Sequence, residues 1–229
     1  MSLSGSTIML NHAGGYVKAC DDSMIETADG FRLLSGHFDR QAQSRLAAEV
    51  LDRVARSPLY QPAMPRTGKP LSVQMTNLGP LGWMTDKVGG YRYQEHHPVT
   101  GAPWPDMPEA LLKLWREVSG WPDPPQACLV NWYGPDARMG LHVDADEDAQ
   151  DAPVVSVSLG DSARFRLGGP DRKGPTRSVR LNSGDVVVLG GRSRRFHHGV
   201  DRIFAGSSTL LPEDWRPGRL NLTLRRVRN

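Results

Sequence analysis

A histidine and an aspartate stand two residues apart at His142 and Asp144, and a histidine pair, His197-His198, follows later in the chain. On a strand, side chains two positions apart point to the same face, so His142 and Asp144 can reach one metal ion together. Two imidazoles and one carboxylate hold Fe(II) on one face and leave its other positions open for oxygen chemistry. These residues therefore predict an iron centre in an oxygen-using enzyme.

Polar and apolar residues alternate along the segment 219–225, which reads Arg-Leu-Asn-Leu-Thr-Leu-Arg. This period of two predicts a strand with leucines on one face and, on the other, Arg219, Asn221, Thr223 and Arg225. By the same argument, Asn131 and Tyr133 share one face of a strand at 126–133. If the leucine face packs against a structural layer, the polar faces of the two strands meet inside a barrel.

Two arginines inside a barrel are costly unless an anion pairs with them. A small dicarboxylate fits this need, because a planar guanidinium binds a carboxylate through two hydrogen bonds and Tyr and Asn side chains add further ones. Beside Fe(II), the expected dicarboxylate is 2-oxoglutarate.

The composition favours a β-rich fold that would position these side chains. The chain has 229 residues, 38% of them hydrophobic, with 18 prolines and 24 glycines, and so many turn residues favour short strands over a helical bundle. Strands are expected at 126–133, 139–143, 153–160, 162–168, 176–181, 185–189, 195–200 and 219–227. Eight short strands are typical of a double-sheet jelly roll.

Two helices are expected beside the strands. Apolar residues recur at helical spacing over 40–56, directly after the candidate N-cap Asp39, and a second helix is predicted at 108–119. Short apolar pieces at 7–10 and 31–34 could add edge strands. The predicted fold class is mainly β with flanking helices (α+β).

We expect a single domain over 1–229 with three parts. Residues 1–60 form an N-terminal extension with a supporting helix, and 109–229 form the jelly-roll core. The segment 61–108 between them is rich in proline, glycine and aromatic residues. Segments of this kind often form binding loops carried by a scaffold, so we expect a lid, with a packed cap as the alternative.

Charge and cysteine content narrow the class of protein. The formal net charge is +3 and the pI is about 9.0, which suits an anionic partner or an ordinary solvated surface. Two cysteines, Cys20 and Cys128, do not make a disulfide framework in a chain of this size. No window approaches the ~20 apolar residues of a membrane span. We therefore expect a cytoplasmic monomer without a membrane segment.

The ordered set of motifs resembles the AlkB family of Fe(II)/2-oxoglutarate dioxygenases that demethylate nucleic-acid bases, and is most similar to its bacterial alkylation-repair members. The stretches that carry the resemblance are SVQMTNLGPLGW at 72–83, GYRY at 90–93, PWPDMP at 103–108, CLVNWYGPDARMGLHVDADE at 128–147, VVSVSLG at 154–160, GDVVVLGG at 184–191, FHHG at 196–199 and RLNLTLR at 219–225. The family implies a double-stranded β-helix jelly roll with a nucleotide-recognition lid over 61–108.

The resemblance also implies the site residues. The metal ligands and catalytic centre would be His142, Asp144 and His198, with His197 pointing away. The contacts to 2-oxoglutarate would come from Asn131, Tyr133, Arg219, Asn221 and Arg225. The contacts to the substrate would come from Trp83, Tyr91, Asp146 and Arg172.

The substrate residues have distinct implied roles. Trp83 would stack on the flipped base with the His142 ring opposite, and Tyr91 would contact the substrate backbone. Asp146 would complement a cationic base at its exocyclic amine, and Arg172 would line the pocket. Each residue also has an alternative role that involves no substrate: Trp83 could pack within the lid, and Asp146 and Arg172 could be ordinary surface charges.

The implied reaction uses Fe(II), 2-oxoglutarate and O₂ to hydroxylate an N-methyl group, and it releases formaldehyde, succinate and CO₂. The implied substrates are 1-methyladenine and 3-methylcytosine in single-stranded or duplex DNA, and in RNA as a further candidate. The sequence departs from the family at two places. The 65–70 loop replaces an expected aromatic stretch, which bears on the substrate range and on DNA-versus-RNA preference. Leu189 stands at an expected tryptophan, which would change the packing near the iron. Alternatives are an oxygenase of tRNA modifications or protein side chains, a zinc hydrolase, and a metal-free jelly-roll nucleic-acid-binding module.

Overall fold

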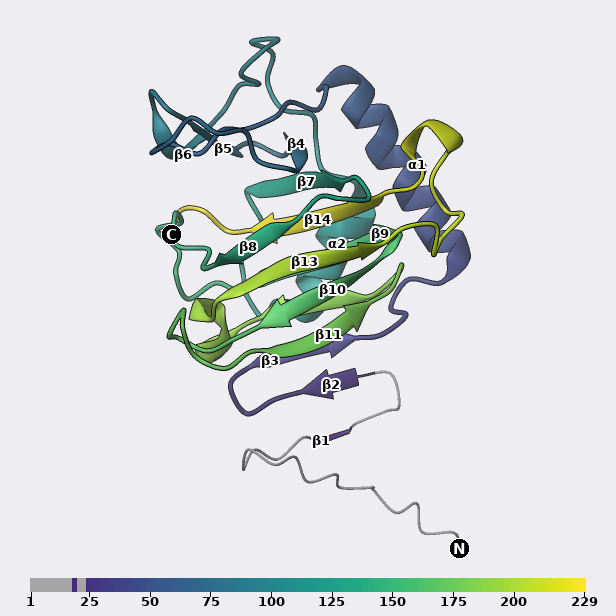
Figure 1. The fold of residues 1–229 in the computed structure, drawn as a ribbon, viewed down its shortest axis with the longest axis vertical. Helices are drawn as coiled ribbons and strands as arrows, with labels where there is room; N and C mark the ends of the chain where they lie inside the picture. Colours follow the sequence, from purple (N-terminus) through teal and green to yellow (C-terminus); the bar gives the residue numbers. More distant parts are fainter. Residues whose placement is uncertain (1–17, 20–23) are drawn as a thin grey trace, which may run out of the picture.

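Two antiparallel sheets face each other in the computed structural model, which describes residues 18–19 and 24–229 (Figure 1). In spatial order, the large sheet contains β1 (Lys18–Ala19), β2 (Met24–Glu26), β3 (Phe31–Leu34), β12 (Val186–Leu189), β9 (Val154–Gly160), β14 (Arg219–Arg225), β7 (Ala127–Tyr133) and β4 (Gln74–Leu78). The small sheet contains β11 (Arg177–Leu181), β10 (Ser162–Leu167), β13 (His198–Phe204) and β8 (Met139–His142). This arrangement confirms the predicted jelly roll.

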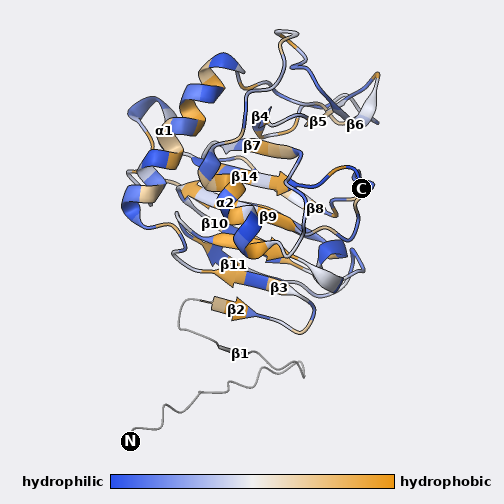
Figure 2. Ribbon diagram, turned by 180° about the vertical axis from the view of Figure 1, so that it is seen from behind, coloured by the Kyte–Doolittle hydropathy of each residue, from blue (hydrophilic) through white to orange (hydrophobic). Residues whose placement is uncertain are grey.

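Two helices cover the outer face of the large sheet, as the view from behind shows (Figure 2). They are α1 (Arg40–Arg56) and α2 (Glu109–Val118), close to the predicted bounds. The Asp39 side chain caps α1 by accepting a hydrogen bond of 2.8 Å from the Ala42 amide. Leucines of β14 and apolar residues of β9 and β12 pack under both helices. Burying this face leaves the opposite face of β14 for the interior.

A second apolar cluster fills the space between the two sheets. Phe31, Val187 and Leu189 of the large sheet meet Phe165 and Ile203 of the small sheet there. The cluster also includes Met75 of β4 and Tyr133 of β7, so it extends to the part of the large sheet that carries the polar side chains. Leu189, at the position of the expected tryptophan, is 2% exposed and belongs to this cluster.

The segment 61–108 is more ordered than its composition suggests. Its strand β4 is an edge of the large sheet, and β5 (Gly82–Asp86) pairs with β6 (Gly90–Gln94) as a separate hairpin. The Asp86 carboxylate accepts hydrogen bonds from the amides of Val88 and Gly89 and so fixes the hairpin turn. Proline and glycine clusters hide the strand periodicity in this part of the sequence.

One predicted strand is wrong in its first part. Residues 195–197 do not join a strand; instead the 3₁₀ helix η1 (Gly191–Arg195) precedes β13, which begins at His198 and continues to Phe204. Gly191 has a φ of +52°, and the Ser193 hydroxyl donates to the Gly190 carbonyl. Arg194 of this turn is buried, with 2% of its surface exposed. A second short 3₁₀ helix, η2 (Glu213–Trp215), precedes β14.

Two sequence features, the possible strand at 7–10 and Cys20, fall among residues that the structure does not describe. Cys128 is described and is a buried free thiol. Across residues 18–19 and 24–229, no helix is long and apolar enough to cross a membrane.

Candidate iron and 2-oxoglutarate site

A cavity of about 490 Å³ opens between the two sheets, and residues of the apolar cluster such as Phe165, Val187 and Leu189 form part of its wall. Strands β7 and β14 line it from the large sheet, β8 and β13 line it from the small sheet, and hairpin β5-β6 borders it above. Every candidate metal, 2-oxoglutarate and substrate residue from the sequence contributes to this lining. The fold thus brings together residues spread from Trp83 to Arg225.

His142, Asp144 and His198 converge at the wall formed by the small sheet. Their ligand atoms all lie within 4.8 Å of one another, and each histidine Nε2 is 3.7 Å from an Asp144 oxygen. His142 and His198 are cross-strand partners on β8 and β13. Strand β8 ends at His142, so Asp144 lies in the following loop rather than on the predicted strand. The β8–β13 strand pair and the first residues of the loop after β8 therefore bring the three side chains together.

Both histidines present the same ring nitrogen to the cluster. His142 Nδ1 lies 2.9 Å from the Gly140 carbonyl oxygen, and His198 Nδ1 lies 3.0 Å from that of Phe196. A carbonyl only accepts, so each Nδ1 carries the proton and each Nε2 keeps its lone pair for a metal. His197 instead makes its ring contact to the Gly169 carbonyl and takes no part in the cluster.

The protonation of these ligands also favours a metal. Burial lowers the pKa of His198 to about 4, although the Asp144 carboxylate opposes the shift. Burial by itself would raise the pKa of Asp144, but Arg225 and the two histidines outweigh it and hold this pKa well below its usual range. At neutral pH the site therefore offers a neutral His198 imidazole and an ionised Asp144 carboxylate, which are the forms that bind metals.

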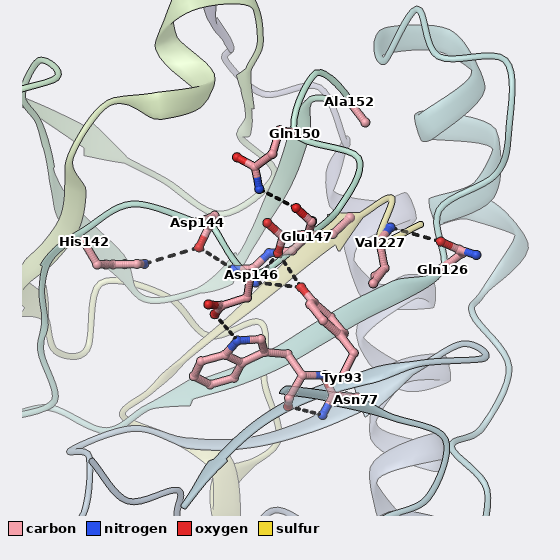
Figure 3. Close-up of polar contacts among 12 residues, drawn as sticks. Asn77, Tyr93, Gln126, His142, Asp144, Asp146, Glu147, Gln150, Ala152 and Val227 are labelled. Atoms are coloured by element: carbon pink, nitrogen blue, oxygen red, sulfur yellow. Dashed lines mark hydrogen bonds and ion pairs between the residues drawn. The ribbon is translucent and has the colours of Figure 1, made fainter. Parts of the chain in front are cut away.

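A buried network that the sequence did not reveal supports Asp144 (Figure 3). Arg225 donates to Asp144 Oδ1 at 2.6 Å and to Glu147 Oε1 at 3.0 Å, and Tyr93 of β6 donates to the same Glu147 oxygen. Arg194 of η1 donates to Glu147 Oε2 at 2.8 Å and to the Asp144 carbonyl. The Glu147 side chain has no exposed surface. Glu147 stands only three residues after Asp144, and no periodicity distinguishes it from its exposed acidic neighbours.

The donors expected for a dicarboxylate lie in register on two neighbouring strands. Arg219 of β14 is the direct partner of Tyr133 on β7, and Asn221 is the partner of Asn131. Arg219 is fully buried, and its Nη2 donates to Ser158 Oγ at 2.8 Å, while its Nε and Nη1 have no partner among the described residues. Burial lowers its pKa to about 10, so Arg219 remains cationic at neutral pH.

Tyr133 and Asn131 add further hydrogen-bonding groups beside Arg219. Burial raises the pKa of the Tyr133 phenol to about 12, so it stays protonated at neutral pH and can donate a hydrogen bond. The Asn131 Oδ1 atom is buried and has no partner among the described residues. Asn221, by contrast, already donates to Ser156 Oγ at 2.6 Å. Most of the buried polar atoms here that lack a partner among the described residues therefore belong to Arg219.

These residues fit both Fe(II) and a dicarboxylate such as 2-oxoglutarate. A buried guanidinium with two unpaired nitrogens costs free energy unless a ligand pairs with it, and a carboxylate is the natural partner. Two Nε2 atoms and one carboxylate match the open-sided ligand set of non-haem Fe(II). Arg225 differs from Arg219, because Asp144, Glu147 and Tyr93 occupy its terminal nitrogens and only its Nε is left over.

Trp83 on β5 borders the cavity and is held from two sides. Asn77 of β4 exchanges hydrogen bonds of 3.0 and 3.1 Å with the Trp83 backbone, and the indole Nε1 donates to Asp146 Oδ2 at 2.7 Å. Tyr91 stacks on the indole with ring centroids 5.8 Å apart and is 50% exposed. The buried Asn77 thus ties the lid hairpin to the large sheet.

Two further predicted substrate residues lie at the cavity mouth. Asp146 is exposed in the loop after β8, so it does not share one strand face with the buried Asp144. Arg172 is exposed in the loop between β10 and β11. Both side chains border the cavity, yet neither is fixed by burial.

Comparisons with known proteins agree with this geometry. The model of the 2OG-Fe(II) oxygenase superfamily matches residues 30–225. The chain is 53% identical over 206 residues to an alpha-ketoglutarate-dependent dioxygenase AlkB homolog of Caulobacter vibrioides, covering 89% of this chain and 90% of that protein. It is 42% identical over 194 residues to alpha-ketoglutarate-dependent dioxygenase AlkB of Escherichia coli, covering 83% and 87%.

A solved structure of a similar protein, OsALKBH1, extends the likeness to the fold. It matches with a TM-score of 0.71 at 32% identity and covers 89% of this chain and 99% of that one. The sequence match, the shared fold and the His-Asp-His cluster agree with one another. The chain therefore belongs to the AlkB family of 2OG-Fe(II) oxygenases and is a dioxygenase that uses Fe(II), 2-oxoglutarate and O₂.

Proposed function

We propose that this protein oxidatively removes N-methyl groups from damaged bases of the 1-methyladenine and 3-methylcytosine type in single-stranded DNA. RNA and duplex DNA are further candidate substrates. The products would be the unmodified base, formaldehyde, succinate and CO₂, which makes the reaction a direct reversal of alkylation damage. The observation that supports this most is the pairing of Trp83 with Asp146 at the mouth of the cavity that holds the His-Asp-His cluster.

In this proposal, the small sheet holds the metal and the large sheet holds the cosubstrate. His142, Asp144 and His198 would bind Fe(II), and Arg219, Tyr133 and Asn131 would bind a carboxylate of 2-oxoglutarate, with Asn221 and Arg225 beside them. O₂ is the oxidant, and Fe(II) with 2-oxoglutarate would supply the chemistry that uses it to hydroxylate the methyl carbon. The chain contributes the orientation of these groups within one cavity.

The lid residues suit a flat cationic base. An indole offers a π-face for stacking, and a carboxylate beside it favours a positively charged ring over a neutral one. A base must leave its stack to enter the cavity, and this costs a few kcal/mol less in a single strand than in a duplex. We therefore propose single-stranded DNA as the preferred substrate, with Tyr91 as a contact to its backbone and Arg172 as part of the pocket lining.

The test is a mass-spectrometric demethylation assay. Anaerobically purified protein would be mixed with Fe(II), 2-oxoglutarate, ascorbate and air, and offered single-stranded DNA carrying one 1-methyladenine, with matched RNA and duplex strands in parallel. We expect loss of the methyl group by the wild-type protein and no loss by the Asp144→Ala variant. Succinate formation without methyl loss would contradict the proposed substrate and direct attention to modified tRNA or protein side chains.

We further propose that the protein acts as a cytoplasmic monomer. The cavity is lined by residues of one chain, so no second copy is needed to complete the site. Light scattering after size-exclusion chromatography, without and with a methylated oligonucleotide, would test the oligomeric state. A dimer in both samples would contradict it.

A further inference from the structure

The outer face of the small sheet carries a row of arginines. Arg164 on β10 is the direct partner of Arg180 on β11 and of Arg202 on β13, so the three residues form one line across three neighbouring strands. Strands lie about 4.8 Å apart, so the row spans roughly 10 Å. Like charges directly opposite each other destabilise a sheet. The row of arginines therefore lowers the stability of the sheet, so a role in folding does not account for it.

These side chains point away from the protein interior. The residues between them, Ala163, Phe165 and Ile203, are buried in the cluster between the sheets. Both Arg180 and Arg202 are exposed, and their guanidinium carbons lie 4.4 and 5.2 Å from the centroid of the Phe204 ring. One aromatic ring thus supports two exposed guanidinium groups.

The charge on this face is strongly one-sided. We define the arginine face as Arg164, Arg166, Arg180 and Arg202. Asp201 is the single acidic residue of strands β10, β11 and β13, and it pairs with Arg164 at 2.7 Å and Arg166 at 3.2 Å. The arginine face with Asp201 has a formal charge of +3, which equals the net charge of the whole chain. Within the described residues, Arg180 and Arg202 form no ion pair with a carboxylate.

The arginine face continues to the mouth of the catalytic cavity. On β10, Arg166 is the partner of Gly199, which lines the cavity, and the next residue, Leu167, is the partner of His198. The loop that follows β10 carries Arg172 at the cavity mouth and the exposed Lys173. In Figure 1, β11, β10 and β13 lie side by side, and this loop joins β10 to β11 at one end of the sheet. Arg172 and Lys173 thus lie in the loop that follows the strand of Arg164 and Arg166, beside the exposed Asp171.

We propose that the arginine face binds the phosphate backbone of the nucleic-acid strand that flanks the target base. This inference rests on the proposed function, because it places the flanking strand beside a base held in the cavity. Guanidinium groups bind phosphates through paired hydrogen bonds, and such contacts position a strand without reading its sequence. A long strand would then bind more tightly than a short one, through contacts that salt weakens.

The test compares a short substrate with a long strand. The variant Arg180→Gln/Arg202→Gln removes the two arginines that lack a carboxylate partner, and it leaves the cavity intact. A matched control, Arg45→Gln/Arg116→Gln, removes the same charge from exposed positions on the helices behind the large sheet. Fluorescence anisotropy would measure binding of an unmethylated single strand of about 20 nucleotides, longer than one binding site, over a range of salt concentrations. Demethylation of a trinucleotide carrying 1-methyladenine would be measured beside it.

We expect the double variant to bind the long strand about tenfold more weakly at low salt, with a salt slope smaller by about 1.4, since each lost phosphate contact removes about 0.7. Its activity on the trinucleotide should equal that of the wild type, which also shows that it folds. An unchanged affinity and slope, or an equal loss in the Arg45→Gln/Arg116→Gln control, would overturn the proposal. Failure of the wild type to demethylate the trinucleotide would instead count against the proposed function, because strand binding is measured without chemistry.

Discussion

At the scale of single residues, Arg219 and Arg225 show that two arginines on one strand face can have different partners. Both are buried on β14 and both line the cavity. Arg225 is neutralised by Asp144 and Glu147, while Arg219 donates to one hydroxyl and its Nε and Nη1 have no partner among the described residues. The alternation of the sequence predicts their common face but does not distinguish these two environments.

Replacing Arg219 by methionine should separate cosubstrate binding from metal binding. The variant removes the unpaired donors without a large change in volume, so we expect little loss of stability in the ligand-free protein. With Mn(II) present and O₂ absent, 2-oxoglutarate at a hundred times its Kd should stabilise the wild type by about 2.7 kcal/mol and raise its Tm by about 5 to 10 °C. The Arg219→Met variant should show the shift caused by Mn(II) but none from 2-oxoglutarate.

Thermal denaturation with each ligand alone and both together measures these shifts. Arg45→Met, which changes an exposed arginine on α1, serves as the control and should keep both shifts. A full 2-oxoglutarate shift in Arg219→Met would show that the cosubstrate does not depend on this guanidinium.

At the scale of secondary-structure elements, Glu147 joins three separate parts of the chain. Its carboxylate accepts hydrogen bonds from Tyr93 of β6, Arg194 of η1 and Arg225 of β14. Removing one member of a buried charged network leaves the others without compensation, which costs about 3 to 5 kcal/mol. We therefore expect Glu147→Ala to lower the free energy of unfolding by this amount in urea titrations.

The control for this loss is the neighbouring acidic residue. Asp148 is exposed, so Asp148→Ala should change the free energy of unfolding by less than about 0.5 kcal/mol. Equal stability of Glu147→Ala and Asp148→Ala would mean that the network contributes nothing to folding.

The lid hairpin carries a second prediction at this scale. Stacking of one base on an aromatic side chain contributes about 1 to 3 kcal/mol, so Trp83→Ala should raise the KM for a methylated oligonucleotide by roughly 5- to 150-fold. The Trp83→Phe variant keeps an aromatic face but loses the hydrogen bond to Asp146, so it separates stacking from this contact. Succinate formation without nucleic acid should be equal in all three proteins. An unchanged KM in Trp83→Ala would place the base elsewhere in the cavity.

Strong periodicity made some elements predictable, and its absence concealed others. The alternation in 219–225 and the helical repeat in 40–56 match β14 and α1, because each has one face buried against a neighbour. Strands β4, β5 and β6 were missed, since prolines and glycines interrupt their alternation. The residues 195–197 are apolar or basic in an order that fits a strand, but backbone and hydroxyl contacts around Ser193 stabilise a 3₁₀ turn before them.

In the candidate site, the residues that line the cavity were easier to predict from the sequence than the residues that support them. Family motifs identify residues that would touch the metal, the cosubstrate or the base. They do not reveal the supporting roles of Glu147 and Arg194, whose hydrogen-bond partners are distant in sequence. A buried polar residue has no periodic signal of its own, because its position is justified by partners that only the tertiary structure brings close.

At the scale of the whole molecule, the two sheets supply different halves of one site. The metal ligands lie on β8, β13 and the loop after β8, while the expected cosubstrate donors lie on β7 and β14 of the large sheet. Both groups line one cavity, and Arg225 of β14 contacts Asp144 directly at 2.6 Å. Occupation of one half must therefore affect the other through charge as well as through contact.

Removing the metal should weaken 2-oxoglutarate binding. Without a divalent cation, the ionised Asp144 carboxylate repels a dicarboxylate that enters the same cavity, whereas a bound cation reverses the sign of the local charge. Isothermal titration calorimetry under anaerobic conditions would compare 2-oxoglutarate binding with Mn(II) and with EDTA. We expect a Kd at least about tenfold higher with EDTA, which corresponds to about 1.4 kcal/mol of coupling. The Asp144→Ala variant should bind 2-oxoglutarate equally with Mn(II) and with EDTA, because it lacks the metal site. Equal affinities in the wild type would show that the two sheets bind their ligands independently.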